Sequence, residues 1–246
     1  MYHTIVIGGG CLGAAAAISL QRKLNKLGKG DKVCLVEKAV LCAAESSRHS
    51  GIVRSANADP DASIMASMSS KMWKNLSSVW GINMEIDEFG AIWIAKKNAD
   101  GENPAWSDLS DRMSKIQLVF EEIDTNSATQ KCGETLLTDE NESYFYEPAA
   151  FQLDPSILRS TLYDAIDENG VVLMEKTEVD TILTKGKEII GITTNNGKID
   201  AKNFVNATGA WSSQLFSKIG LKIPVTIEPV SVVNWMESPK QIRYEY

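Results

Sequence analysis

The sequence has few cysteines, and their spacing matches no known motif. Cys11, Cys34, Cys42 and Cys132 are scattered along 246 residues without a CxxC pair. Closely spaced Cys and His residues mark zinc sites and redox motifs, so no metal is predicted. The pattern is typical of reduced, mostly buried thiols in a cytoplasmic protein.

Long apolar runs and an excess of positive charge are also missing. No stretch of about 18 apolar residues occurs, so no membrane span is predicted. The formal net charge of -7 argues against nucleic acid as a partner. The first residues lack the basic-then-apolar pattern of a signal peptide, because Tyr2 to Gly10 instead predicts a strand that enters a turn. Hydrophobic residues make up 43% of the chain, enough for one substantial core or two small domains.

The chain begins with one complete strand–helix–strand unit. Thr4 to Ile7 is a short apolar strand, residues 14–27 have the composition of a helix, and residues 33–36 form a second strand. Between the first strand and the helix lies the run Gly8-Gly9-Gly10-Cys11-Leu12-Gly13, and Glu37 ends the second strand. A glycine fingerprint in this context is specific for a dinucleotide site.

Each residue of this fingerprint has a physical task. Gly8 permits the tight turn out of the strand, Gly10 lets the backbone approach a pyrophosphate, and Gly13 lets the helix lie close to the sheet. The helix N-terminus offers free N–H donors and a partial positive charge to phosphates. The Glu37 carboxylate suits ribose hydroxyls and would repel a 2′-phosphate, which argues against NADP. The alternative is a glycine turn that binds no ligand.

Periodicity predicts further helices and strands. Ile64, Met68, Met72, Leu76 and Trp80 recur every four residues, which predicts an amphipathic helix with these side chains in the core.

Residues 84–95 favour strands around Gly90, and residues 96–141 form a polar insertion with one expected helix near residues 108–122. Asp154-Pro155 predicts the start of another helix, which Gly170 ends.

The region after Gly170 predicts a run of strands. Residues 171–173 and 179–183 are apolar and β-branched, and residues 189–194 and 198–201 flank Asn195-Asn196-Gly197 as a hairpin. Residues 204–207 form a last short strand. The whole pattern predicts an α/β protein: a Rossmann-like domain with part of a mixed-sheet (α+β) domain.

Four segments together resemble the D-amino acid oxidase superfamily, especially its sarcosine oxidase and dimethylglycine dehydrogenase branches. They are Ile5 to Gly10 with Gly13, Val36-Glu37-Lys38, Ser47 to Ser55, and Asn206-Ala207-Thr208-Gly209-Ala210-Trp211, in the family's order and at about its spacing. The resemblance covers nearly the whole chain, although the polar insertion matches poorly.

The resemblance implies that FAD is the cofactor. The residues then expected to bind it are Gly8, Gly10, Cys11, Leu12, Gly13, Glu37, Lys38, Ser47, His49, Val179, Ala207, Thr208, Gly209 and Trp211.

In the family, the loop after the second strand runs along the flavin ring, which maps to residues 46–55. Arg48, His49 and Arg54 are therefore the expected catalytic residues, since a cation near the ring stabilises its anionic reduced form. A histidine of this loop carries a covalent flavin bond in the dimethylglycine dehydrogenase branch but is missing in heterotetrameric sarcosine oxidases. We expect a non-covalent histidine, with a bond through His49 as the alternative.

The resemblance implies oxidation of a secondary or tertiary amine or amino acid, by hydride transfer to the flavin and hydrolysis of the imine. Two alternatives stay open: oxidation of a 2-hydroxy acid or of glycerol 3-phosphate, and a non-catalytic flavin-binding subunit. The amine, the electron acceptor and the oligomeric state are not predicted.

The family's domain pattern implies four segments. Residues 1–82 and 151–220 are expected to form the FAD-binding domain, residues 83–150 the first part of the substrate domain, and residues 221–246 the start of its return. Family members continue well beyond this length with another glycine-rich turn. We therefore expect a partner subunit, or a longer natural product, to supply the remaining half.

Overall fold

The computed structural model describes most of the chain, and its described residues are 1–57, 59–132, 136 and 138–228. They divide into two compact units. The first unit contains residues 1–49, 76–84 and 154–228, and the second contains residues 50–75 and 85–153. The segment expected at 1–82 is thus interrupted, because residues 50–75 pack within the second unit. Most of the expected return at 221–246, from residue 229 onward, lies outside the described residues.

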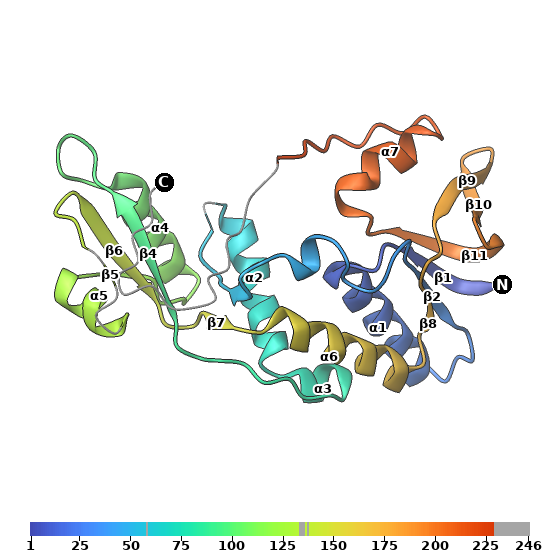
Figure 1. Ribbon diagram of the computed structural model, residues 1–246, viewed down its shortest axis with the longest axis horizontal. Helices are drawn as coiled ribbons and strands as arrows, with labels where there is room; N and C mark the ends of the chain where they lie inside the picture. The colour runs from blue at the N-terminus through green and yellow to red at the C-terminus, as the bar shows by residue number, and fades with distance from the viewer. Residues whose placement is uncertain (58, 133–135, 137, 229–246) are drawn as a thin grey trace. The chain divides into compact units, whose positions relative to one another are not determined.

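The first unit is built on one mixed sheet with the strand order β8-β2-β1-β11-β10-β9 (Figure 1). Its strands are β1 (Tyr2–Ile7), β2 (Val33–Val36), β8 (Val172–Met174), β9 (Val179–Lys185), β10 (Glu188–Thr194) and β11 (Gly197–Asn206). The pairs β8–β2, β2–β1 and β1–β11 are parallel, whereas β10 pairs antiparallel with both β11 and β9. The predicted hairpin at Asn195-Asn196 therefore extends the parallel sheet on one side.

β11 is longer than the sequence pattern predicts. Two separate strands were expected at residues 198–201 and 204–207, but one strand runs from Gly197 to Asn206. Its first residues pair with β10, and residues 201–206 pair with β1. A single strand can serve both neighbours because each uses a different edge of it.

The helices of the first unit begin and end at local signals in the sequence. They are α1 (Cys11–Lys26), α3 (Leu76–Trp80), α6 (Pro155–Asn169) and α7 (Ser212–Ser217), with 3-10 turns η1 (Glu45–Ser47) and η2 (Gly209–Trp211). For α6, the Asp154 carboxylate accepts the Ser156 N–H across 2.6 Å, and Gly170 ends the helix at φ 72°. Aspartate before proline and glycine after the last turn are the expected capping signals.

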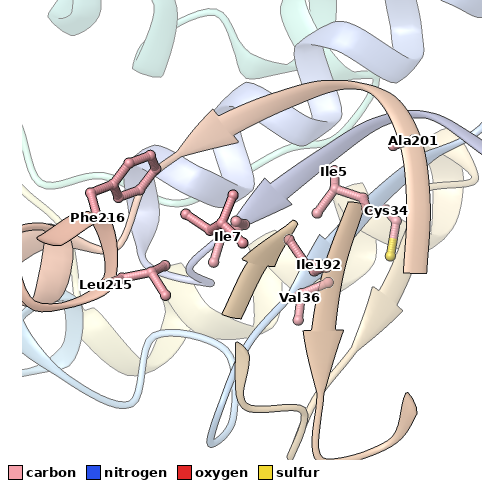
Figure 2. Packing of buried hydrophobic residues seen from close by; sticks show 9 residues of the cluster. Ile5, Ile7, Cys34, Val36, Ile192, Ala201, Leu215 and Phe216 are labelled. Carbon is pink, nitrogen blue, oxygen red and sulfur yellow. The ribbon is translucent and has the colours of Figure 1, made fainter. Parts of the chain in front are cut away.

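The core of this unit lies on both faces of the parallel strands. On one face, Leu215 and Phe216 of α7 pack in a cluster with Ile5, Ile7 and Val36 (Figure 2). Successive side chains alternate between the two faces of a sheet, so the neighbouring strand residues point to the opposite face, where α1 packs on β1 and β2. The strands therefore form near-continuous apolar runs, as buried parallel strands do.

The second unit contains two small antiparallel sheets. Three strands pair in the order β4-β6-β5, and two short strands form the pair β3–β7. The strands are β3 (Ile52–Val53), β4 (Ala91–Lys96), β5 (Glu121–Ile123), β6 (Glu142–Glu147) and β7 (Phe151–Gln152), and the helices are α2 (Pro60–Trp73), α4 (Pro104–Lys115) and α5 (Thr125–Lys131). Its core is aromatic: the rings of Trp106, Phe120 and Phe145 stack, and Trp93 meets Trp106 and Phe120 edge-on.

The polar insertion has more regular structure than expected. One helix was expected near residues 108–122, but α4 ends at Lys115, and β5, α5 and β6 follow it. β5 pairs with β6, and β6 in turn pairs with β4, so these strands depend on non-local partners that local periodicity does not reveal.

The prediction of one buried helix face from Ile64 to Trp80 is wrong in its first half. Two helices occur instead of one, and the exposed fractions of Ile64, Met68 and Met72 are 42%, 62% and 45%. The buried side chains of α2 are the serines Ser63, Ser67 and Ser70. Small serines let the helix approach its neighbours closely, and the Ser63 hydroxyl accepts the Asn57 N–H and so satisfies a nearby backbone group.

No helix in the part of the chain that the structure describes is long and apolar enough to cross a membrane.

Candidate dinucleotide-binding site

The glycine turn leaves no room for side chains at its first and last glycines. Gly8 has a φ of 108°, and a Cβ there would overlap the carbonyl of Ala207. A Cβ on Gly13 would overlap the carbonyl of Gly8. The turn therefore brings α1 close to β1 and β11, and only glycine permits both contacts.

Gly10 differs from these two glycines because an added Cβ would meet no backbone atom. A Cβ there would meet only the hydroxyl oxygen of Ser46, at 3.0 Å. As the N-cap of α1, Gly10 contributes no side-chain cap, and the first turn of α1 contains no acidic residue. The first turn of α1 thus adds no negative charge of its own to the partial positive charge of the helix N-terminus. A helix N-terminus without a side-chain cap suits the pyrophosphate of a dinucleotide.

Glu37 is tied to the glycine turn. One carboxylate oxygen accepts the Gly9 N–H across 2.7 Å, and the other accepts the Ala39 N–H across 2.8 Å. Each carboxylate oxygen has two acceptor positions, so each keeps one for a further donor. The carboxylate is half-buried and suits the two hydroxyls of a ribose whose pyrophosphate lies at Gly10.

The segment after β11 reaches the same edge of the sheet. The Ala207 N–H donates to the carbonyl of Ile7 across 2.8 Å, and the Thr208 hydroxyl donates to the Asn206 side chain across 2.7 Å. The Lys38 ammonium lies 3.8 Å from the centre of the Trp211 ring. Lys38 is therefore a neighbour of Trp211 in the fold, although about 170 residues separate them in the sequence.

Three other expected cofactor residues lie in this unit. Leu12, at the start of α1, is 84% exposed. Val179 begins β9 and packs on the cluster of Figure 2, two residues after Thr177, whose N–H donates to the Glu37 carbonyl across 2.8 Å. The Ser47 hydroxyl donates to the Ala44 carbonyl within the turn η1.

Sequence reasoning missed three residues that build the turn. The Ser46 hydroxyl oxygen accepts the Cys11 N–H across 3.0 Å, and the Cys42 N–H donates to the carbonyl of Gly9 across 2.8 Å. Glu175 holds the same loop through the Leu41 N–H at 2.7 Å. The loop between β2 and η1 has no periodicity, so nothing local in the sequence indicated these contacts.

The loop of the three expected catalytic residues is divided between the two units. Arg48 and His49 belong to the first unit, where Arg48 is exposed and His49 is half-buried. The His49 Nε2 lies 3.1 Å from the carbonyl oxygen of Ser46. That contact places the imidazole against the residue whose hydroxyl accepts the Cys11 N–H at the glycine turn.

Arg54 belongs to the second unit and has a well-defined local environment. Its guanidinium lies over the Trp93 ring at 4.4 Å and donates to the Ala56 carbonyl across 3.0 Å. The buried Glu147 carboxylate completes the arrangement by accepting the Ser55 and Ala56 N–H groups and the Trp93 indole N–H. Arg54 is thereby held with its charge in a partly exposed position.

The structure provides no candidate metal centre in the ranges it describes, since no three His, Cys, Asp or Glu side chains gather there as ligands would.

Comparisons with known proteins agree on one family. The family model described as FAD dependent oxidoreductase matches residues 3–243. The chain is 24% identical to the mitochondrial pyruvate dehydrogenase phosphatase regulatory subunit of Mus musculus, over 87% of this chain and 23% of that protein. It is 23% identical to sarcosine oxidase subunit beta of Rhizobium meliloti (strain 1021), over 91% of this chain and 53% of that protein. It therefore spans about half of the second relative and about a quarter of the first.

Solved structures show the same fold. L-proline dehydrogenase from P. horikoshii superposes with a TM-score of 0.75 at 24% identity, covering 93% of this chain and 58% of that one. Glycine oxidase from Bacillus cereus ATCC 14579 superposes with a TM-score of 0.70 at 23% identity, covering 88% of this chain and 58% of that one. The α/β architecture expected from the sequence is confirmed.

Proposed function

The chain belongs to the family of FAD dependent oxidoreductases, and from that premise we propose that it oxidises a secondary or tertiary amine or amino acid. The proposed substrate class is sarcosine- or dimethylglycine-like. Support comes from relatives named sarcosine oxidase subunit beta and 4-methylaminobutanoate oxidase, the latter 22% identical over 91% of this chain. The observation that carries the FAD part of the proposal is the gathering of the glycine turn, Glu37 and Trp211 at one edge of the sheet, and the amine part rests on these relatives.

In this proposal the first unit holds FAD through its pyrophosphate and its adenosine ribose. The pyrophosphate lies at Gly10, and the N–H groups at the start of α1 donate to it. Glu37 accepts the ribose hydroxyls, and exposed Leu12 is covered by the nucleotide. The Ala207–Trp211 segment closes the site from β11.

The bound flavin supplies the chemistry by accepting a hydride equivalent from the carbon beside the amine nitrogen. The contribution of the chain is to orient the groups and to place charge. We propose that Arg48 and Arg54 supply positive charge that favours the reduced cofactor. Arg54 suits this role because Trp93 and Ala56 fix its guanidinium while leaving it partly exposed. His49 is proposed as a non-covalent neighbour of the flavin, with a covalent bond as the alternative.

A second candidate function has a specific observation in its favour. A relative matched over 87% of this chain is named a regulatory subunit, which supports a non-catalytic flavin-binding role. Oxidation of a 2-hydroxy acid or of glycerol 3-phosphate is the remaining alternative, because the residues that are proposed to bind FAD do not select the substrate.

We also propose a partner polypeptide segment, in the same chain or in another one. The chain spans 53% of a relative that is itself named a subunit. In addition, α2 exposes an apolar face of Ile64, Met65, Met68 and Met72, with exposed fractions from 42% to 64%. Contiguous exposed apolar side chains are typical of surfaces that another segment covers. The four cysteines form no disulfide, which suits the cytoplasmic compartment that we propose.

Anaerobic bleaching of the flavin tests these alternatives. The chain is purified together with any co-purifying partner, loaded with FAD, and mixed with sarcosine, N,N-dimethylglycine, lactate or glycerol 3-phosphate. We expect loss of the oxidised flavin band with the amines alone. Bleaching by lactate or glycerol 3-phosphate alone would contradict amine oxidation, and no bleaching with any substrate in the full assembly would favour the regulatory role.

A further inference from the structure

Two cysteines that lie far apart in the sequence meet beside the glycine turn. The sulfurs of Cys11 and Cys42 are 4.0 Å apart, although 31 residues separate them in the chain. Cys11 is the first residue of α1, and Cys42 lies in the loop after β2 with a positive φ of 56°. The Cys42 N–H donates to the carbonyl of Gly9, so the fold itself holds the two residues together.

The two thiols differ in exposure and in acidity. Cys11 is half-buried, whereas Cys42 is 1% exposed. The hydrogen bond from Cys42 lowers the pKa of Cys11 to about 7, with desolvation opposing and Ser46 assisting. Donation to Cys11 and burial raise the pKa of Cys42. Cys11 is thus the more acidic thiol of the pair, and Cys42 is the less acidic one.

The location of Cys11 strengthens this assignment. A sulfur at a helix N-terminus lies in the partial positive charge of the helix, which favours the thiolate. Two charged groups affect the pKa of Cys42. The Arg159 guanidinium on α6 lowers the pKa of that thiol, and the Glu37 carboxylate raises it. An acidic, half-buried cysteine beside a buried thiol is the arrangement of an oxidisable cysteine with its resolving partner.

We propose that Cys11 and Cys42 form a peroxide-sensitive dithiol, an oxidative modification site that a bound dinucleotide protects. The oxidant is hydrogen peroxide. The Cys11 thiolate attacks one peroxide oxygen, an S–O bond forms, the O–O bond breaks, and hydroxide leaves. The Cys42 sulfur then attacks the Cys11 sulfur, an S–S bond forms, and the S–O bond breaks. The Cys42 proton and one solvent proton convert the two leaving oxygens to water, so two thiols lose two electrons to one peroxide.

Protection follows from the position of the dithiol, and this part rests on the proposed function. A pyrophosphate at Gly10 would lie against the N-terminus of α1, where Cys11 is the first residue. Its negative charge opposes formation of the thiolate, and its bulk obstructs the approach of peroxide to Cys11. Dinucleotide binding and oxidation therefore compete at one turn.

The first experiment treats the reduced, flavin-free chain with hydrogen peroxide and identifies cross-linked peptides by mass spectrometry. We expect the loss of two thiols per chain, a Cys11–Cys42 peptide pair, and full recovery with dithiothreitol. The rate should rise with pH through about 7, as Cys11 ionises. A different cysteine pair, or four thiols that survive peroxide, would overturn the proposal.

Variants separate the roles of the two sulfurs. Cys42→Ser should stop at a sulfenic acid on Cys11 that dimedone traps, and Cys11→Ser should react no faster than the remaining thiols. Cys132→Ser is the matched control, because Cys132 follows α5 in the second unit and its replacement should leave the disulfide unchanged. Equal dimedone labelling of Cys11→Ser and Cys42→Ser would contradict the assignment of Cys11 as nucleophile.

The second experiment repeats the reaction with saturating FAD, with bound flavin measured in parallel. We expect oxidation at least tenfold slower than in the flavin-free chain. Flavin that binds without slowing oxidation would overturn the protection. Failure to bind flavin would count against the proposed function instead, while the reaction of the flavin-free chain would still decide whether the dithiol exists.

Discussion

The Glu37 carboxylate accepts the Gly9 N–H across 2.7 Å, so the acid that ends β2 is bonded to the turn that ends β1. The phosphate-binding turn and the ribose acid are thus one connected structure. Their separation is set by a hydrogen bond as well as by the parallel pairing of the two strands. Substitutions at either residue are therefore expected to affect the binding of the whole dinucleotide.

Gly10→Val should weaken FAD binding without unfolding the chain. The backbone at Gly10 has a φ of -73°, which any residue adopts, and the only neighbour of an added Cβ is the Ser46 hydroxyl at 3.0 Å. The valine side chain would occupy the space proposed for the pyrophosphate. We expect at least a tenfold rise in the FAD dissociation constant, or about 1.4 kcal/mol, measured by fluorescence titration.

Gly30→Ala is the matched control for that substitution. A Cβ at Gly30 would meet nothing within 4 Å, so binding and stability should both be unchanged. Unchanged FAD affinity in Gly10→Val would place the pyrophosphate elsewhere.

Glu37→Gln should weaken both the turn and the nucleotide site. The amide has one oxygen, whereas the carboxylate serves two backbone N–H groups, so either Gly9 or Ala39 loses its acceptor. We expect a loss of about 1–3 kcal/mol in FAD binding and stability combined, measured by titration and urea denaturation. Glu188→Gln, on an exposed residue of β10, is the control. FAD affinity equal to that of the control would contradict a ribose contact.

The parts of the fold that the sequence predicts well are those with local signals. Asp154, Pro155 and Gly170 set the bounds of α6 through contacts within a few residues of the helix ends. The glycine fingerprint likewise acts locally, between β1 and α1. Apolar periodicity alone gave the wrong face for α2, because it finds a stripe but does not tell whether a core or another segment covers that stripe.

The missed elements depend on distant partners. β6 has the polar-aromatic sequence Glu142-Ser143-Tyr144-Phe145-Tyr146-Glu147 and is a strand because it pairs with both β4 and β5. The contact between Cys11 and Cys42 likewise depends on the course of an irregular loop. Pattern analysis of single segments has no access to either relationship.

Met68→Ala should have little effect on stability, because its side chain is 62% exposed in the structure. We expect a change within about 0.5 kcal/mol by urea denaturation. Leu76→Ala, at a buried position of α3, should cost about 2–5 kcal/mol. An equal loss in the free energy of unfolding for the two variants would support the prediction from the sequence, in which both side chains belong to one core.

His49 should not hold the flavin covalently. The imidazole Nε2 lies 3.1 Å from the Ser46 carbonyl oxygen, a contact that one ring nitrogen makes as a hydrogen-bond donor. After acid precipitation we expect free flavin in the supernatant for both the natural chain and His49→Ala. A yellow pellet from the natural chain that His49→Ala loses would establish the covalent bond.

Glu147→Gln should destabilise the second unit. The buried carboxylate accepts three N–H groups, from Ser55, Ala56 and Trp93, and in either orientation the glutamine amide directs its own N–H groups toward a donor. Leaving a buried donor without an acceptor costs about 1–3 kcal/mol, measurable as a lower urea midpoint. The tryptophan emission should also change, because the Trp93 indole loses its charged acceptor or the Arg54 guanidinium moves off the ring. Glu121→Gln, on the exposed side of β5, controls for loss of charge. A urea midpoint for Glu147→Gln equal to that of Glu121→Gln would mean that this carboxylate does not hold the loop that carries Arg54.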